Sequence, residues 1–533
     1  MHAASLTMER TSLFATLRRL TGHSLVYGSA DVATHVVNLL LTPLYVAFLT
    51  PDDFGILAVL MLFESVAKVV FRMGLEAGFF RIHYELSSGD QQRRLAGTVA
   101  LFSAGSGAAL FLAIVLGAPL VVRALFGQPA PELGRYVILK AADVYVGTFL
   151  FVPLILLRIR NQPGRFASLT ATRNVVNTAL KVLLVVRGYG VGGVLWSDLI
   201  ATSALALALT PILWQSARFA WASGHLRSVL AFGLPKAPHG IMVQLLNLSD
   251  RRFLLGYLGR AVTGFYDKAY ALGAGVKFVM SPFESAWQPF IYSHAEQPDG
   301  PQLFARTATY IWAAFLTVGL AVAIFGRELL MTFTFTNPAF WVAAPVIPIV
   351  TLAYLFHGAF LLTSIGIGIE KKARYYPVIT GCAAAVNLAA NFLLIPRWGM
   401  LGAAWATVAA YAVMAALGFW FSQRLYPIPF EAGRLARLSA AATVSFSLAL
   451  LVPAPDLSGL SIAAVASRVQ FLLHVAPRGL LPTVAAKLAL LAVFPALVVA
   501  FGVVRPEEWA WLQRWRAGRR SNSGDRGETA LPR

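Results

Sequence analysis

The sequence predicts an all-α polytopic membrane protein with about fourteen transmembrane helices, on the evidence of its composition, its apolar runs and its charge placement. Of the 533 residues, 58% are apolar and 13% are charged, and the mean hydropathy is +0.67. A soluble chain of this length needs many more charged residues to cover its surface. Apolar runs of about 20 residues, enough for a helix to cross a hydrocarbon core of about 30 Å, recur along the whole chain.

The apolar runs also place the individual helices. We expect them at 25–48, 55–80, 96–116, 136–157, 167–186, 192–214, 234–254, 263–290, 307–330, 343–366, 376–396, 399–422, 435–453 and 484–504. Ahead of them, residues 1–23 mix Arg with Leu and Phe, which predicts an amphipathic cytoplasmic segment on the membrane surface. The single cysteine, Cys382, excludes a disulfide within the chain.

The placement of charge predicts the orientation in the membrane. The formal net charge is +20, and Lys and Arg are concentrated in the segments that lie on the same side as the N-terminus. This is the positive-inside asymmetry, and it puts both termini in the cytoplasm. Because topology accounts for the basic charge, no nucleic-acid partner is expected.

An internal repeat predicts two similar lobes. An ungapped offset of 209 residues aligns Gly55 with Gly264 and Gly190 with Gly399, each pair at the start of an expected helix. Glycine at such places suits tight turns and close helix approach. Six helices per copy give both copies the same orientation, and parallel repeats of this kind are a transporter architecture with a site between the lobes.

The repeat divides the chain into segments. We expect the amphipathic N-terminal segment at 1–23, an N-lobe of six helices at 24–214, a basic amphipathic cytoplasmic linker at 215–233, a C-lobe of six helices at 234–422, two extra helices around a Pro-rich insertion at 423–505, and a basic, aromatic interfacial segment with a disordered tail at 506–533. The short apolar run within the insertion is compatible with a surface helix or a re-entrant helix.

Four charges at a four-residue spacing mark the second expected helix. Glu64, Lys68, Arg72 and Glu76 stand among apolar residues, and on one continuous helix they form a stripe about 120° wide. Facing lipid, each charge costs about 2.5–3.5 kcal/mol near the membrane centre, whereas an i,i+4 pair contributes only about 0.2–0.5 kcal/mol. We therefore expect the stripe to line a wet cavity between the lobes, together with Lys277, which the offset pairs with Lys68.

Further polar side chains lie within the other apolar segments. They include Asp31, Lys140, Asp143, Arg173, Lys181, Asp198, Asp250, Arg251, Arg252 and Glu284. Two bland alternatives stay open: Lys140, Arg251 and Arg252 lie near helix ends, where long side chains reach headgroups, and Asp31 can bond to a neighbouring helix. The excess of Lys and Arg favours an anionic substrate such as a phosphate or diphosphate.

Five stretches carry a family resemblance. They are PLYVAFLTPDDFGILAVL (43–60), RIHYEL (81–86), FGLPKAPHGIMVQLLNLSDRRFLLGYLGRAVTGFYDKAYALG (232–273), SPFESAWQPF (281–290) and KKARYYPVITGCAAAVNLAANFLLIPRWGMLGAAWAT (371–407). In this order they resemble the polysaccharide-unit flippases, Wzx-like exporters of O-antigen or exopolysaccharide units within the superfamily of multidrug, oligosaccharidyl-lipid and polysaccharide exporters (the MOP superfamily). Lys236 and His239 depart from the family, being polar where apolar residues are usual, and so does the insertion at 454–483.

The resemblance implies a flippase in a bacterial plasma (inner) membrane. Such a protein moves a polyprenyl-diphosphate-linked oligosaccharide from the inner to the outer leaflet by alternating access of two lobes, driven by H⁺ or Na⁺. A polysaccharide polymerase and a chain-length regulator are implied as partners, and no metal or other cofactor is. The implied cavity cations are Lys68, Arg72, Arg173, Lys181, Lys277 and Arg251, and the implied coupling or paired acids are Asp31, Glu64, Glu76, Asp250 and Glu284.

Three other functions compete with this interpretation. An enzyme is disfavoured because the sequence lacks His-Glu-x-x-His, Gly-x-x-x-x-Gly-Lys-Ser/Thr and Gly-x-Ser-x-Gly motifs. A cation-coupled multidrug exporter of the same superfamily would favour an acidic, aromatic cavity. A flippase for a lipid-linked peptidoglycan precursor shares the helix count and an arginine-rich cavity, but the Leu-Asn-x-x-Asp-Arg stretch resembles the polysaccharide branch more closely.

Overall fold

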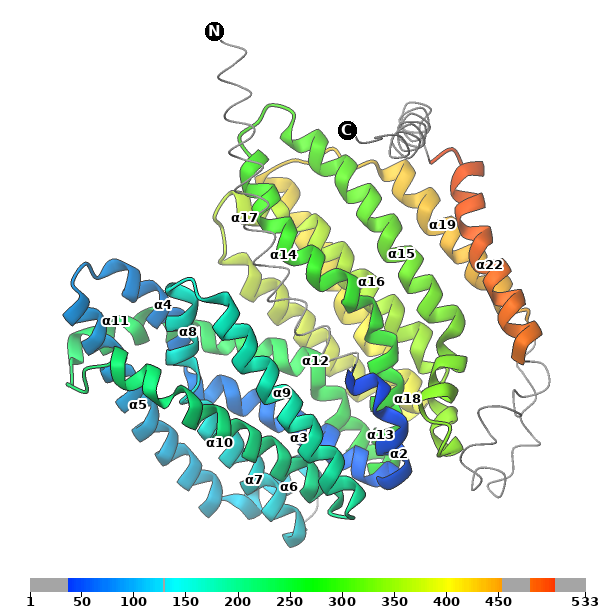
Figure 1. Ribbon diagram of the computed structural model, residues 1–533. Helices are drawn as coiled ribbons and strands as arrows, with labels where there is room; N and C mark the ends of the chain where they lie inside the picture. The colour runs from blue at the N-terminus through cyan, green and yellow to red at the C-terminus, as the bar shows by residue number, and fades with distance from the viewer. Residues whose placement is uncertain (1–36, 128–129, 453–479, 504–533) are drawn as a thin grey trace, which may run out of the picture. The chain divides into compact units, whose positions relative to one another are not determined.

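The computed structural model describes residues 37–127, 130–452 and 480–503, and within them every regular element is a helix (Figure 1). The elements are α2 (Thr42–Phe48), α3 (Pro51–Arg72), α4 (Leu75–Glu85), α5 (Gly89–Leu116), α6 (Ala118–Phe126), α7 (Pro131–Gly147), α8 (Phe151–Ile159), α9 (Pro163–Val186), α10 (Gly190–Ser216), α11 (Ser223–Gly233), η1 (Leu234–Lys236), α12 (Ala237–Leu258), α13 (Arg260–Gly273), η2 (Ala274–Val276), α14 (Lys277–His294), α15 (Gly300–Phe333), η3 (Pro338–Ala343), α16 (Val346–Thr363), α17 (Ile365–Ile369), α18 (Tyr375–Leu425), α19 (Ala432–Ala449) and α22 (Leu480–Ala500).

The predicted all-α membrane fold is confirmed. Ten helical stretches of the described residues are long and apolar enough to cross a membrane. The total of fourteen stays a prediction, since most of the expected helix at 25–48 falls outside the described residues. So do the amphipathic segment at 1–23, most of the Pro-rich insertion and the interfacial tail.

The described residues form two compact units. One comprises the described residues up to Gly300 together with Gly326–Pro427, and the other comprises Pro301–Phe325 together with the described residues from Ile428 onward. The division into an N-lobe and a C-lobe is a different one, and it stays a prediction. Both candidate clusters described below lie in the first unit.

The helix α3 begins four residues earlier than the apolar run indicates. Thr50 is its N-cap: the hydroxyl accepts a bond from the Asp53 amide at 3.2 Å, and the Asp53 carboxylate accepts one from the Thr50 amide at 2.9 Å. This is a capping box followed by Pro51 at the first helical position. Proline is tolerated there because the backbone N–H that it lacks would have no partner within the helix. The sequence Thr-Pro-Asp-Asp is therefore the first turn of α3.

The expected continuous helix at 55–80 is wrong. Met73 and Gly74 both have positive φ values, 45° and 70°, and they separate α3 from α4. The backbone of Gly74 lies against that of Gly233, so that a Cβ on Gly74 would stand 2.0 Å from the Gly233 carbonyl oxygen. Only glycine permits this approach. Glu76 therefore lies on α4, beyond the break, and not on the same helix as Glu64.

A reciprocal glycine contact joins α3 to α13. A Cβ on Gly55 would stand 2.0 Å from the carbonyl oxygen of Arg260, and a Cβ on Gly264 would stand 2.1 Å from that of Pro51. The offset of 209 residues relates Pro51 to Arg260 as well as Gly55 to Gly264. The contact is therefore the same when the two helices are exchanged, as a two-fold relation between them requires.

A second pair of offset-related glycines has matching backbones. Gly190 begins α10 with φ +54°, and Gly399 bends α18 with φ +55°. The long helix α18 is thus two expected helices, 376–396 and 399–422, joined across this bend. These local similarities support the repeat, which stays a prediction for the lobes as a whole.

The linker after α10 is attached to α5. Arg218 pairs with Asp90 at 2.8 Å, and the Thr98 hydroxyl both donates to the Ala220 carbonyl at 2.9 Å and accepts from the Ala222 amide at 3.1 Å. The helix α11 then packs against α4 and α5. The second half of the expected linker is therefore a packed helix.

Hydrogen bonds of buried polar side chains connect the helices of the second unit. Glu431 accepts bonds from Thr309 and Arg434, both at 2.8 Å, and Arg434 also donates to the Val503 carbonyl at 2.8 Å. Lys487 donates to the Ile324 carbonyl at 2.8 Å. These bonds fasten α19 and α22 to the first part of α15.

Candidate functional site

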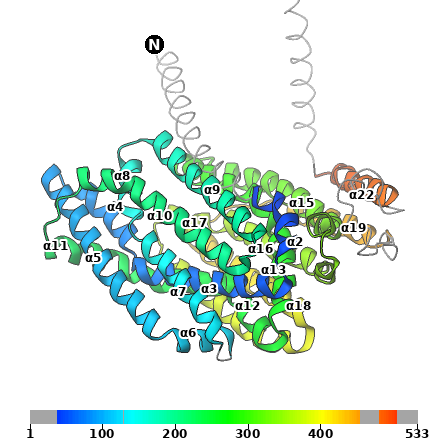
Figure 2. The same ribbon diagram turned by 60° about the horizontal axis from the view of Figure 1, so that its bottom comes forward.

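A buried lysine joins three helices. The helices α3, α7 and α10 pack together, with α9 beside α10, as Figures 1 and 2 show. The Lys140 side chain on α7 is 6% exposed, and its Nζ lies 2.8 Å from Glu64 Oε2 on α3 and 2.9 Å from Asp198 Oδ2 on α10. Buried lysine is stable as a cation only when carboxylates face it, and here two do.

Two further lysines extend this arrangement into a chain of alternating charge. Lys68 Nζ lies 2.5 Å from Glu64 Oε1, and Lys181 Nζ on α9 lies 3.2 Å from Asp198 Oδ1. The order is Lys68, Glu64, Lys140, Asp198, Lys181, which we call the lysine-ended network. Three lysines against two carboxylates leave one net positive charge. Its two ends are its accessible parts, because the Lys68 side chain is 45% exposed and that of Lys181 is 20% exposed.

Amide and hydroxyl groups complete the network. Asn177 on α9 donates to Asp198 Oδ1 at 3.0 Å, and Arg173 donates to the Thr202 hydroxyl at 3.0 Å. Thr202 is also a hydrogen-bond partner of the buried Asp143 carboxyl. The other Asp143 oxygen, Oδ1, has no hydrogen-bond partner, and Asp143 makes no ion pair within the part of the chain that the structure describes.

The other predicted pair of the charge stripe stands apart. Arg72 Nη1 lies 2.7 Å from Glu76 Oε1, and the pair bridges the break between α3 and α4. Both side chains are more than one-third exposed, so the pair itself contributes little to stability. An anion can approach Arg72 without the desolvation of a buried site.

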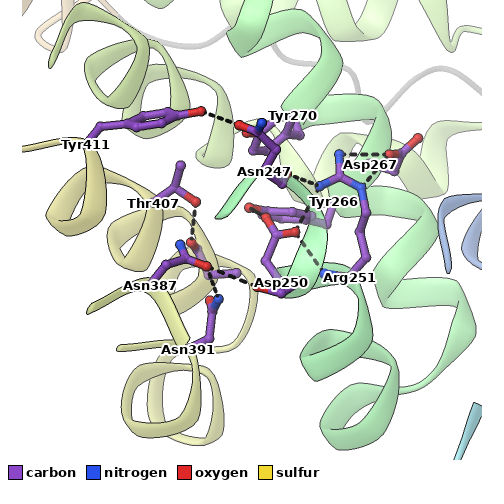
Figure 3. Close-up of polar contacts among 12 residues, drawn as sticks. Asn247, Asp250, Arg251, Tyr266, Asp267, Tyr270, Asn387, Asn391, Thr407 and Tyr411 are labelled. Carbon is purple, nitrogen blue, oxygen red and sulfur yellow. Dashed lines mark hydrogen bonds and ion pairs between the residues drawn. The ribbon is translucent and has the colours of Figure 1, made fainter. Parts of the chain in front are cut away.

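A second cluster lies between α12, α13 and α18 (Figure 3). Arg251 Nη1 lies 2.9 Å from Asp250 Oδ1, and Arg251 Nε lies 3.2 Å from Asp267 Oδ1. The Tyr266 hydroxyl donates to Asp250 Oδ2 at 2.6 Å. The guanidinium also lies over the ring of Tyr270, 4.6 Å from its centroid. With 3% of its side chain exposed, Arg251 is enclosed by these groups.

Amide side chains link this cluster to α18. Asn387 Oδ1 accepts bonds from Ser249 at 3.1 Å and from Asn391 at 2.9 Å. The Tyr411 hydroxyl donates to Asn247 Oδ1 at 2.6 Å. Figure 3 shows these residues turned toward one another from the two helices. The result is a polar layer that links α12 to α18.

Two further predicted site residues, both on α14, are accessible. Lys277 begins α14 and is exposed, with Nζ 4.8 Å from the ring centroid of Tyr354. The Tyr354 hydroxyl is 3.1 Å from that of Tyr270. Glu284, two turns further along α14, is exposed as well. Lys277 thus presents an exposed ammonium group that also contacts the Tyr354 ring.

The structure brings some of the predicted residues together and separates others. Glu64, Lys68 and Lys181 belong to one network, Arg173 lies beside it, and Asp250 and Arg251 belong to the closed cluster. Asp31 lies outside the described residues. Their roles as cavity cations or coupling acids stay predictions. Lys140 and Asp198 had no predicted role in the site, because only their contact across α7 and α10 shows that they connect the predicted lysines.

Comparison with known proteins identifies the family. Residues 46–338, more than half of the chain, match the model of the polysaccharide biosynthesis protein family. The chain belongs to this family. A shorter match, 35% identical over 92 residues, relates it to an uncharacterized membrane protein of Methanocaldococcus jannaschii. That match covers 17% of this chain and 18% of the relative, so the chain spans under a fifth of that relative's length.

The fold of this polysaccharide biosynthesis family member is that of the MOP superfamily. The lipid II flippase MurJ in an inward closed conformation aligns with a TM-score of 0.67 and 12% identity, covering 89% of this chain and 98% of MurJ. An inward-facing MATE multidrug transporter aligns with a TM-score of 0.58 and 14% identity, over 75% and 94%. A MOP transporter from Pyrococcus furiosus gives 0.52 and 16%, over 76% and 94%. The family match and these alignments bear out the predicted polysaccharide biosynthesis family and the predicted fold.

Proposed function

We propose that this family member is a flippase for a polyprenyl-diphosphate-linked oligosaccharide in polysaccharide biosynthesis. The observation that carries the proposal is the lysine-ended network, which offers two accessible ammonium groups on a buried, fixed base. Family membership supplies the biosynthetic context. The proposed direction is from the inner to the outer leaflet of a bacterial plasma membrane, with both termini in the cytoplasm.

The network suits a diphosphate because two carboxylates hold its three lysines in place and do not neutralise all of their positive charge. Glu64 and Asp198 orient the three lysines, yet one positive charge remains. A bond between an ammonium and a phosphate oxygen is charge-assisted, and it gains strength where water is scarce. Lys68 and Lys181 are the accessible members, and we assign the first contacts with diphosphate to them. Arg72 and Lys277 supply further accessible cations.

Coupling to H⁺ needs an acid that is free to change its charge. Glu64 accepts bonds from two lysines, so we assign it to orienting Lys68 and Lys140. Asp143 is buried and has no ion pair within the described residues. The groups around it are Lys140 on its own helix, Glu64 on α3, and Asp198 and Thr202 on α10. We propose that Asp143 takes up the coupling proton, which removes one negative charge beside the lysines.

The test is mass spectrometry of lipid-linked saccharides in cells that lack this protein. Accumulation of one polyprenyl-diphosphate oligosaccharide supports the proposal and identifies the glycan. Complementation with Arg72→Ala or Lys277→Ala should leave the saccharide accumulated although the variants insert at normal levels. Arg135→Ala, a change at an exposed arginine on α7, is the control that restores export. Normal export with both cavity variants contradicts the assignment of these cations.

A second candidate is a flippase for a lipid-linked peptidoglycan precursor. The observation that favours it is the alignment with the lipid II flippase MurJ over 89% of this chain. The same experiment separates the two, because the accumulating lipid then carries a peptidoglycan precursor. A multidrug exporter leaves both lipid pools unchanged, and its loss lowers the efflux of organic cations instead.

A further inference from the structure

A cavity apart from both clusters opens beside α6, α12 and α18. Its volume is about 620 Å³, and its lining includes Gly127, Arg252, Gly256, Tyr257 and Phe392. This is the size range of small-ligand sites in proteins, roughly 300–1,000 Å³. Its wall combines aromatic and aliphatic side chains with polar surface of about the same extent, and the one charged side chain in it is Arg252. We call it the Arg252 cavity.

The guanidinium of Arg252 has bonding capacity to spare. Its Nε donates to the Ala124 carbonyl near the end of α6, at 2.8 Å. The four N–H bonds on its two Nη atoms have no partner among the described residues, and no carboxylate pairs with it there. The neighbouring Arg251, by contrast, is enclosed by Asp250 and Asp267. Two adjacent arginines thus have opposite environments, and only Arg252 is available to an external anion.

Two glycines let the guanidinium lie close to the backbone. A Cβ on Gly256 would stand 2.9 Å from Arg252 Nη1, and a Cβ on Gly127 would stand 3.5 Å from Arg252 Nη2. Together with the bond from Nε, this fixes the plane of the group. A fixed guanidinium presents its remaining N–H groups as a fork that matches the oxygens of a phosphate.

The apolar rim indicates the source of that phosphate. Tyr257 and Phe392 are 45% and 61% exposed, and in a chain that spans a membrane such aromatic side chains meet lipid at the interface. A free inorganic anion gains nothing from these rings, whereas a phospholipid places its phosphate at the arginine and its glycerol and first methylenes against them. We propose that the Arg252 cavity binds the phosphate headgroup of a membrane lipid. The proposal does not rest on the flippase function.

The test is a binding titration of the purified full-length protein in detergent. The probe is dioctanoyl phosphatidylglycerol, and saturable binding is followed by native mass spectrometry and by thermal stabilisation. Dioctanoylglycerol, which lacks the phosphate, should not bind. Arg252→Gln should raise the dissociation constant about tenfold or more, since it removes charge-assisted bonds. Arg123→Gln, at an exposed arginine on α6, should leave it unchanged.

A second variant keeps the charge of Arg252 and reduces the space beside its guanidinium. Gly256→Ala places a methyl group against Arg252 Nη1, so it should weaken lipid binding while α12 keeps its helical structure. Equal affinities of the wild type and Arg252→Gln would overturn the proposal, as would equally tight binding of dioctanoylglycerol. Inorganic phosphate that stabilises the protein as well as the lipid does, and with the same dependence on Arg252, would overturn the lipid assignment. None of these readouts measures transport, so their failure leaves the proposed function standing.

Discussion

Replacing Lys140 with methionine tests whether Lys140 is the central cation of the lysine-ended network. Lys140 is the one member of the network that faces both carboxylates. Methionine has a similar length and no charge, so the packing of α7 against α3 and α10 is largely kept. What the variant loses is the cation between Glu64 and Asp198.

The expected cost follows from burial and from the partners that remain. Removing one partner of a buried ion pair costs about 3–5 kcal/mol, because it leaves an uncompensated charge. Here Glu64 keeps Lys68 at 2.5 Å and Asp198 keeps Lys181 at 3.2 Å. We therefore expect the lower end, about 3 kcal/mol. Lys68→Met is the matched control: its side chain is 45% exposed, and exposed pairs contribute about 0–1 kcal/mol.

The assay is thermal unfolding in one detergent, followed by circular dichroism. The expected order of melting temperatures is wild type, then Lys68→Met slightly lower, then Lys140→Met clearly lowest. A Lys140→Met variant that melts with the wild type would refute the reasoning.

Two further predictions concern helix contacts. Gly55→Ala and Gly264→Ala should each lower the unfolding free energy by about 2–3 kcal/mol, since the added Cβ meets a backbone carbonyl of the partner helix at 2.0 or 2.1 Å. Gly105→Ala on α5, where a Cβ meets nothing within 4 Å, should leave the unfolding free energy unchanged or raise it by up to about 1 kcal/mol. Equal melting temperatures for all three variants would contradict the close crossing of α3 and α13. Tyr266→Phe should cost about 1.5–3 kcal/mol in the same assay by removing the bond to buried Asp250, and a wild-type melting temperature would exclude that bond.

The helices were predictable because the hydrocarbon of the membrane favours helical backbone. In hydrocarbon a backbone must satisfy its own hydrogen bonds, so each long apolar run becomes a helix. The interruption at Met73 and Gly74 was not predictable in the same way. Its cause is the approach of Gly233, which lies far away in sequence. Apolar periodicity carries no information about which backbone crosses which.

The candidate site was predictable in its residue types and not in its connections. A charged side chain in an apolar helix signals a site on energetic grounds alone, and that argument selected both Lys68 and Arg251. It carries no information about how far each side chain is exposed, because exposure depends on contacts with other helices. The structure separates them by exposure: Lys68 is 45% exposed, and Arg251 is 3% exposed.

This difference in exposure indicates different roles for the two clusters. Exchanging the partners of Arg251 would require breaking bonds to Asp250 and Asp267 in a site that water does not reach, and each broken buried pair costs several kcal/mol. Lys68 and Lys181 can exchange a carboxylate for a phosphate oxygen while they stay solvated. In the proposed cycle, the anion is therefore bound and released by Lys68 and Lys181, whereas the second cluster links α12, α13 and α18. Neutral substitutions should accordingly act on transport at Lys68 and Lys181, and on stability at Arg251.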